Sequence, residues 1–243
     1  MLPAKERLIV ALDVDSVAEA ETLVSRLQDQ VGVFKVGMQL YNSVGPDIVR
    51  RIQNSGGRVF LDLKLHDIPN TVGQASVALT RQRVFMFNIH TAGGSEMMKK
   101  AVDMTRQEVA DSVIPLPLVI GVTVLTSINQ AILENEMGVP RSVEEQVVHW
   151  ARLAKESGLN GVVASPKEIR AIRAECGNDF LIITPGVRPA WAAVNDQKRA
   201  MTPREAVEAG ASYLVVGRPI TGAADPVEAA KRIVKEMEEG LEC

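Results

Sequence analysis

Cysteine and histidine are scarce in this chain of 243 residues, which has two cysteines and three histidines. The cysteines, Cys176 and Cys243, are too few for a disulfide framework or a cysteine-based metal site. The histidines do not have the spacing of metal ligands; they are His66, His90 and His149. The sequence therefore predicts neither a disulfide-stabilised fold nor a metal site.

The chain also lacks long hydrophobic runs and any excess of basic residues. Its apolar stretches fall short of the roughly 18 residues that identify a membrane-spanning helix. Its formal net charge of -3 gives no electrostatic footprint for nucleic acid or for an anionic membrane. The first apolar run is short and ends at Asp13, so we expect no signal peptide. These absences favour a cytoplasmic protein with neither a nucleic-acid nor a membrane partner.

What the sequence contains instead is a regular alternation of apolar, β-branched runs with helical segments. Runs of this length and composition are typical of strands that are buried on both faces. Eight of them occur, at 7–14, 33–38, 58–64, 84–90, 116–125, 161–165, 180–186 and 213–218.

Helix signals lie between these runs. Ser142 and Glu145 have the spacing of a capping box, and Thr202 precedes a proline at the first position of a predicted helix. Strands that alternate with helices form a parallel sheet, and a (β/α)8 TIM barrel typically takes about 250 residues. We therefore predict a single-domain TIM barrel over residues 1–243. The alternative is an open, doubly wound sheet.

Charged residues lie near the carboxyl ends of three predicted strands, where barrel enzymes have their active sites. Asp13 ends the first run, Lys35 lies in the second, and Asp62, Lys64 and Asp67 follow one another at the third. Because side chains alternate across a strand, Asp62 and Lys64 should point the same way. A buried charge is costly unless it is paired, so we expect one array with Lys35 and Lys64 interleaved between Asp62 and Asp67. Such an array favours a catalytic site over ordinary ion pairs at strand ends.

The eighth run ends in Gly217 and Arg218, within VVGRPITGA. Barrels often bind phosphate on the loops that follow strands 7 and 8. Gly217 lets the backbone approach an anion, and Arg218 offers a bidentate guanidinium group. With Gln197 on the preceding loop, these residues predict a phosphate site, and Arg188 is a further candidate for substrate binding.

Two connections are longer than a barrel needs, at 126–141 and 187–201. Long connections in compact domains are often lids or binding loops. Both follow the carboxyl ends of predicted strands, so both should border the site. Trp191 on the second could be a hydrophobic latch or an exposed ring.

Together these motifs resemble the orotidine 5′-monophosphate decarboxylase family. The similarity includes D-x-K-x-x-D after the third strand, ALD on the first, K-x-G on the second, TVLTS ending at Ser127, TPGVRP at 184–189 and V-G-R-P-I after the eighth. It extends from Leu8 to the final helix. The resemblance implies cofactor-free decarboxylation of orotidine 5′-monophosphate to uridine 5′-monophosphate in pyrimidine biosynthesis.

The resemblance also implies a role for each charged residue. Asp62 would face the substrate carboxylate, and Lys64 would protonate C6 of the pyrimidine as carbon dioxide leaves. Lys35 would hold the array and contact the ribose side, and Asp13 would bind ribose hydroxyls. A protonated lysine aimed at C6 can stabilise a developing carbanion and then supply the proton.

Other residues take their roles from the resemblance alone. Pro185 and Val187 would line the base, and Ser127 would recognise its amide edge, with Thr126 as a second candidate. Gln197 would bridge phosphate and pyrimidine. In this family, residues at the positions of Asp67 and Thr71 reach into the neighbouring subunit's site, which implies a homodimer with shared active sites.

Two alternatives remain at this point. A magnesium-dependent sugar-phosphate decarboxylase or aldolase of the same suprafamily would use the metal to stabilise an enediolate. By resemblance, those enzymes carry an acid where this chain has Lys35, and a lysine opposes a divalent cation. A non-catalytic phosphate-binding barrel would retain Gly217 and Arg218 but would have no use for the interleaved charges.

Overall fold

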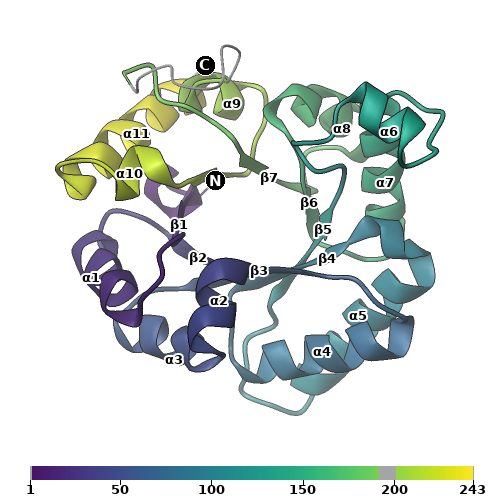
Figure 1. The fold of residues 1–243 in the computed structure, drawn as a ribbon, viewed down its shortest axis with the longest axis horizontal. Coiled ribbons are helices and arrows are strands. Elements are labelled where there is room, and N and C mark those ends of the chain that lie inside the picture. Colours follow the sequence, from purple (N-terminus) through teal and green to yellow (C-terminus); the bar gives the residue numbers. More distant parts are fainter. Residues whose placement is uncertain (1, 192–200, 243) are drawn as a thin grey trace.

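Eight parallel strands form a closed barrel, in which each strand pairs with the next and β8 pairs with β1 (Figure 1). The computed structural model describes residues 2–191 and 201–242. The predicted TIM barrel is therefore confirmed, and the open sheet is excluded. The strands are β1 (Leu8–Ala11), β2 (Val33–Gly37), β3 (Val59–Leu65), β4 (Met86–His90), β5 (Leu118–Val122), β6 (Gly161–Val163), β7 (Leu181–Pro185) and β8 (Tyr213–Val216).

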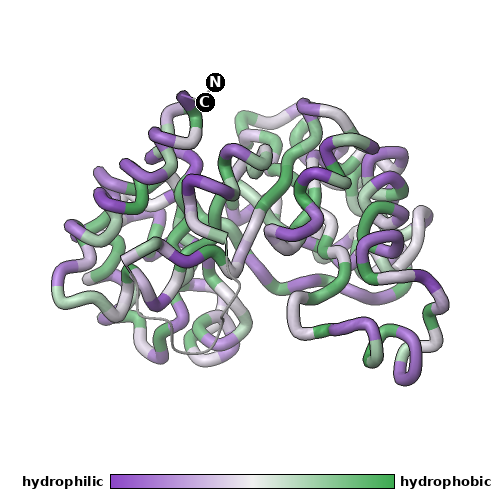
Figure 2. Tube along the Cα trace, turned by 90° about the horizontal axis from the view of Figure 1, so that it is seen from above, coloured by the Kyte–Doolittle hydropathy of each residue, from purple (hydrophilic) through white to green (hydrophobic). Residues whose placement is uncertain are grey.

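Helices form an outer ring, with at least one in every connection between consecutive strands. Along most of them hydrophobic and hydrophilic residues alternate, as expected where one side packs on the barrel (Figure 2). Within the described ranges, no helix combines the length and apolar character that crossing a membrane requires. The helices are α1 (Val17–Leu27), α2 (Met38–Val44), α3 (Asp47–Asn54), α4 (Pro69–Arg81), α5 (Gly94–Val109), α6 (Gln130–Asn135), α7 (Val143–Glu156), α8 (Ile169–Cys176), α9 (Pro203–Glu208), α10 (Arg218–Thr221) and α11 (Pro226–Leu241).

Helix starts follow the capping signals in the sequence. Ser142 Oγ accepts the N–H of Glu145 at 3.2 Å, and the Glu145 carboxylate accepts the N–H of Ser142 at 2.8 Å. Thr202 and Glu205 make the same reciprocal pair at the start of α9. The connection at 126–141 differs from the expected loop because it contains α6, which is capped by Asn129.

The hydrophobic core has two parts, because successive side chains of a strand point to opposite faces. One part fills the barrel interior and the other lies between the strands and the helices. Burial on both faces explains why each strand is a nearly continuous apolar run in the sequence. The interior residues include Ile9, Val33, Phe60, Met86, Ile120, Ile183 and Tyr213.

Candidate active site at the carboxyl ends of the strands

The open end of the barrel carries polar side chains directly beyond the interior core. On four neighbouring strands, the residue two positions after an inward-facing apolar residue is charged or polar. Two positions along a strand return to the same face, so these polar residues also point inward. The pairs are Ala11 and Asp13, Val33 and Lys35, Phe60 and Asp62, and Met86 and Asn88.

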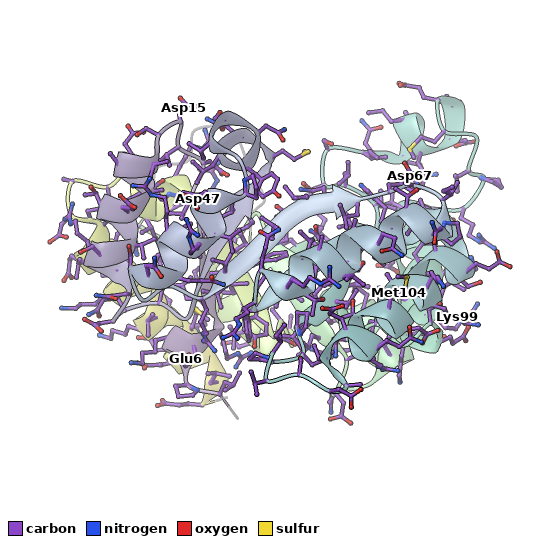
Figure 3. All side chains as sticks on the ribbon, turned by 90° about the horizontal axis from the view of Figure 1, so that it is seen from below. Glu6, Asp15, Asp47, Asp67, Lys99 and Met104 are labelled. Carbon is purple, nitrogen blue, oxygen red and sulfur yellow. The ribbon has the colours of Figure 1, made fainter. Side chains whose placement is uncertain are left out.

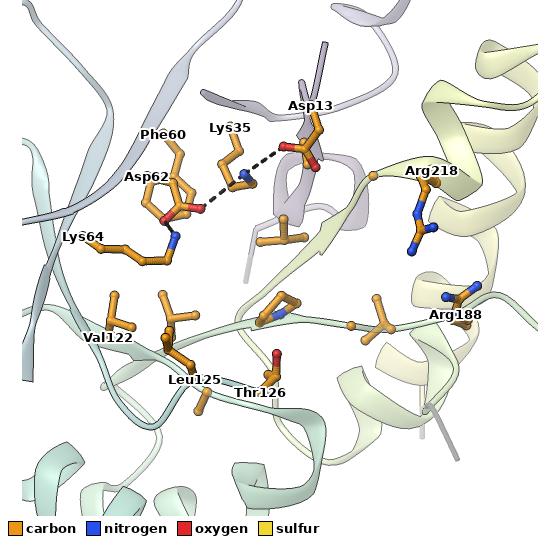
Figure 4. Close-up of a pocket in the computed structure, with 18 of the residues that line it drawn as sticks. Asp13, Lys35, Phe60, Asp62, Lys64, Val122, Leu125, Thr126, Arg188 and Arg218 are labelled. Carbon is orange, nitrogen blue, oxygen red and sulfur yellow. Dashed lines mark hydrogen bonds and ion pairs between the residues drawn. The ribbon is translucent and has the colours of Figure 1, made fainter. Parts of the chain in front are cut away.

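Lys35 joins a carboxylate on β3 and one in the segment that follows β1. Its ammonium nitrogen Nζ lies 3.2 Å from Asp62 Oδ2 and 3.5 Å from Asp13 Oδ1. Asp62 Oδ1 in turn accepts a hydrogen bond from Lys64 Nζ at 2.7 Å (Figure 4). The side chains of Lys35 and Asp62 are only 12% and 13% exposed, so these charges are largely shielded from water. Asp13 extends the array on the Lys35 side. The place of Asp67 beyond Lys64 stays a prediction.

The approach of Lys64 to Asp62 depends on an irregularity in β3. The pairing of β3 with β4 shifts register between Leu61 and Leu65, so β3 bulges over these residues. Lys64 has a backbone φ of +55°, which is the left-handed region that side-chain-bearing residues seldom adopt. Simple alternation predicts a regular strand here. The structure instead brings the lysine to its carboxylate from a bulge.

Asp62 is held in its charged form against the effect of burial. Burial is the largest influence on its pKa and by itself raises it. The attraction of Lys35 and Lys64, with hydrogen bonds from Lys64 and Asn88, outweighs burial and leaves the pKa of Asp62 below its ordinary value of 3.8. Asp62 is therefore an anion at neutral pH.

A cavity of about 390 Å³ opens beside the array, which is a size suited to a small-molecule ligand. Asp62 and Lys64 lie at one end, and Arg188 and Arg218 lie at the other (Figure 4). Two guanidinium groups are suited to binding a phosphate. The predicted residues that line the cavity are Asp13, Lys35, Asp62, Lys64, Thr126, Pro185, Val187, Arg188, Gly217 and Arg218.

Three of the predicted residues that the structure describes do not line it. Asp67 is exposed at the end of β3, and its carboxylate accepts the backbone N–H of the next residue at 2.7 Å (Figure 3). Thr71, in the first turn of α4, is also exposed. Ser127 is exposed outside the cavity, whereas its neighbour Thr126 lines the cavity. Gln197 lies outside the described residues.

The sequence analysis missed the apolar wall of the cavity and a polar partner of the array. Phe60, Val122 and Leu125 contribute apolar surface. They belong to the same runs as the core residues, so no sequence signal separates them. Asn88, by contrast, is a polar residue inside the apolar run 84–90, and that signal could have identified it.

The loop after β7 is anchored to α11. The guanidinium carbon of Arg232 lies 4.2 Å from the centre of the Trp191 ring, and Trp191 is partly buried against the core. The backbone N–H of Arg188 donates to the carbonyl of Met201 at 2.9 Å, which closes the base of the loop. Trp191 is thus partly buried and not an exposed ring, and its role as a latch stays a prediction.

The fold and the site define a (β/α)8-barrel enzyme with interleaved charges at one end of its pocket and paired guanidinium groups at the other. The sequence pattern of the orotidine 5′-phosphate decarboxylase / HUMPS family matches residues 6–233. The chain belongs to this family, as the resemblance predicts.

Individual relatives match over nearly the whole chain. The orotidine 5′-phosphate decarboxylase of Heliobacterium modesticaldum is 58% identical and covers 99% of both chains. That of Syntrophomonas wolfei is 56% identical and covers 98% of this chain and 100% of its own. The crystal structure of orotidine 5′-phosphate decarboxylase from Lactobacillus acidophilus has a TM-score of 0.84 at 39% identity and covers 95% of this chain and 98% of its own.

The lowered pKa of Asp62 predicts a pH-dependent contribution to stability. A carboxylate with a depressed pKa in the folded state stabilises the protein above its unfolded pKa, and this contribution is lost as pH falls through the folded value. We therefore expect the unfolding free energy of the wild type to decrease relative to that of Asp62→Asn as pH falls below the ordinary value of 3.8. Urea unfolding at a series of pH values measures it.

The control is Asp103→Asn, which removes an exposed carboxylate on α5. It measures the general effect of losing one negative charge. A wild-type to Asp62→Asn difference that stays constant from neutral to acid pH would contradict the account of Asp62.

Proposed function

We propose that this chain converts orotidine 5′-monophosphate to uridine 5′-monophosphate and carbon dioxide by proton transfer from Lys64, without a metal or organic cofactor. The observation that carries the proposal is the charge array at one end of a cavity whose other end has two arginines. The substrate has matching chemistry, with a carboxylate on the pyrimidine and a phosphate on the ribose. Because both nucleotides are charged and cross bilayers poorly, the proposal includes a cytoplasmic location.

The substrate would lie along the cavity. The phosphate would contact Arg188 and Arg218, which can donate several hydrogen bonds to its oxygens. The ribose hydroxyls would lie near Asp13 and Lys35, in the middle of the polar layer. The pyrimidine would then place C6 and its carboxylate at Asp62 and Lys64. Binding energy from the phosphate, which is remote from C6, can hold the ring in this position.

The reaction breaks one carbon–carbon bond and forms one carbon–hydrogen bond. The bond between C6 and the carboxylate carbon breaks, carbon dioxide leaves, and the electron pair stays on C6. The ammonium group of Lys64 stabilises this negative charge and transfers a proton from Nζ to C6. Solvent then returns a proton to Lys64.

Asp62 contributes through its own charge. Since the lysines keep its pKa low, it is an anion when the substrate binds. Its repulsion of the substrate carboxylate raises the energy of the bound substrate, and the departure of neutral carbon dioxide relieves the repulsion. Asp62 Oδ1 also accepts the hydrogen bond from Lys64 Nζ, which would keep the proton donor next to the breaking bond.

A magnesium-dependent reaction fits this site less well. Lys35 Nζ occupies the space between Asp13 and Asp62, within 3.5 Å of both carboxylates. A divalent cation bound by these carboxylates would be repelled by the ammonium group. The non-catalytic alternative does not explain why four charges are held together at a cost in desolvation.

Replacement of the proton donor tests the proposal directly. Lys64→Ala should lower kcat by at least about 10²–10⁴-fold, the usual contribution of general acid catalysis, while uridine 5′-monophosphate still binds. The measurement is loss of orotidine 5′-monophosphate absorbance by purified protein in the presence of a chelator. Lys99→Ala, an exposed lysine on α5, is the matched control and should retain full activity.

Retention of a tenth of the wild-type rate by Lys64→Ala would overturn its assigned role. Loss of wild-type activity in the chelator, with recovery on adding magnesium, would favour the sugar-phosphate class instead.

Removal of a phosphate contact should have a different kinetic signature. Arg218→Ala should raise KM by about 10-fold or more, because a charged hydrogen-bond donor contributes about 1.5–3 kcal/mol, and should change kcat less. Arg218→Lys should raise KM by a smaller factor, because it retains the charge without the bidentate geometry. Steady-state kinetics of both variants measure the effect, and an unchanged KM in Arg218→Ala would exclude the phosphate placement.

We also propose that the enzyme is a homodimer whose active sites are shared. Asp67 and Thr71 lie next to the barrel mouth but are exposed, so they are available to a second subunit. Between them is Ile68, which is 66% exposed and offers apolar surface for an interface. In the dimer, Asp67 would contact the array of the partner subunit.

Mixing two inactive variants tests the shared site. If Asp67→Ala and Lys64→Ala subunits exchange at random, about a quarter of all sites have neither substitution. Activity should therefore recover toward that fraction of the wild-type value. Tagged subunits verify the exchange, and no recovery after verified exchange would contradict the shared site.

A further inference from the structure

Asn88 makes two hydrogen bonds that join the backbone of the proposed proton donor to its carboxylate partner. Its amide nitrogen Nδ2 donates to Asp62 Oδ1 at 2.7 Å, and its Oδ1 accepts the backbone N–H of Lys64 at 2.8 Å. Asn88 lies on β4, is only 1% exposed, and is not among the residues that line the cavity. Asn88 therefore contacts the charge array without bordering the cavity.

The hydrogen bond from the Lys64 N–H to Asn88 Oδ1 takes the place of a backbone hydrogen bond between β3 and β4. The register shift takes the backbone of β3 out of regular pairing between Leu61 and Leu65. A buried N–H without an acceptor costs free energy, and a left-handed lysine adds backbone strain. Asn88 Oδ1 supplies the acceptor at the residue where φ is +55°.

The first bond fixes the carboxylate. Asp62 Oδ1 accepts from both Lys64 Nζ and Asn88 Nδ2, each at 2.7 Å. An asparagine amide presents a donor and an acceptor at a fixed spacing and carries no charge. A leucine of similar size would leave the Lys64 N–H without this acceptor and Asp62 Oδ1 with Lys64 Nζ as its remaining donor. An aspartate would place a second anion against Asp62.

We propose that Asn88 is a positioning residue that holds the Lys64 backbone and the Asp62 carboxylate in the geometry for proton transfer. The inference rests on the proposed function. A displacement of about 1 Å in such a pair can cost on the order of 100-fold in rate. Because Asn88 does not border the cavity, its loss should affect the chemical step much more than substrate binding.

The test compares Asn88→Ala and Asn88→Asp with Thr91→Val. Thr91 is also fully buried next to β4 and donates one hydrogen bond, to the carbonyl of Val122 at 2.8 Å, without touching Asp62 or Lys64. Thr91→Val therefore reports the effect of losing a buried hydrogen bond alone. The measurements are kcat, KM, the affinity for uridine 5′-monophosphate, and thermal unfolding.

Both Asn88 variants should lose about 10–100-fold in kcat with KM and product affinity within about threefold of wild type. Thr91→Val should keep kcat within about threefold at temperatures where it is folded. Asn88→Asp retains the size and one acceptor, so it keeps the test decisive if the alanine variant unfolds.

Wild-type kcat in either folded Asn88 variant would overturn the inference, as would an equal loss in Thr91→Val. Failure of both Asn88 variants to fold would also overturn it, because Asn88 would then be a structural residue. Absence of turnover in the wild type would instead refute the proposed function.

Discussion

The site depends on keeping one carboxylate charged inside the barrel. Burial alone would raise the pKa of Asp62, and two ammonium groups on different sides of it reverse that effect. Lys35 Nζ lies 3.2 Å from Asp62 Oδ2, and Lys64 Nζ lies 2.7 Å from Asp62 Oδ1. Removing one member of such a buried group leaves the others uncompensated, which is more costly than the intact array. The charges are therefore interdependent, and Lys64, the proposed proton donor, is held by its ion pair with Asp62.

The barrel supplies this arrangement with little departure from regular structure. In the strands, apolar residues such as Val33 and Phe60 fill the interior, and the next inward positions are polar. The charged residues thus begin at the position along each strand where the apolar interior residues end. Within the described strands, the bulge at Lys64 is an irregularity where the backbone is left-handed and the neighbouring strand supplies Asn88 as a hydrogen-bond partner. Strain at this point fits its proposed role, because functional sites are where such conformations are retained.

Much of the fold could be predicted from the sequence because the strands are nearly continuous apolar runs and several helices, among them α7 and α9, start at capping signals. Lys35 and Asp62 were identifiable for the same reason, since a charge in an apolar run needs a partner. The bulge was not predictable, because it depends on pairing with β4 rather than on the residues of β3. The family resemblance ranked Ser127 above Thr126, but Thr126 is the one that lines the cavity, since adjacent loop residues have no fixed periodicity. The proposed roles of Asp67 and Thr71 come from the family resemblance, because both side chains are exposed outside the cavity.

The central claim is that Lys35 and Lys64 together hold Asp62 ionised, and the titration of Asp62 itself tests it most directly. Carbon-13 NMR of labelled aspartate, assigned with an asparagine substitution, gives the pKa of this carboxyl group in the wild type and in Lys35→Met. The account predicts a wild-type pKa below the ordinary value of 3.8 and a higher one in the variant, since burial would then act against fewer cations. A wild-type pKa at or above 3.8, or the same value in both proteins, would contradict it.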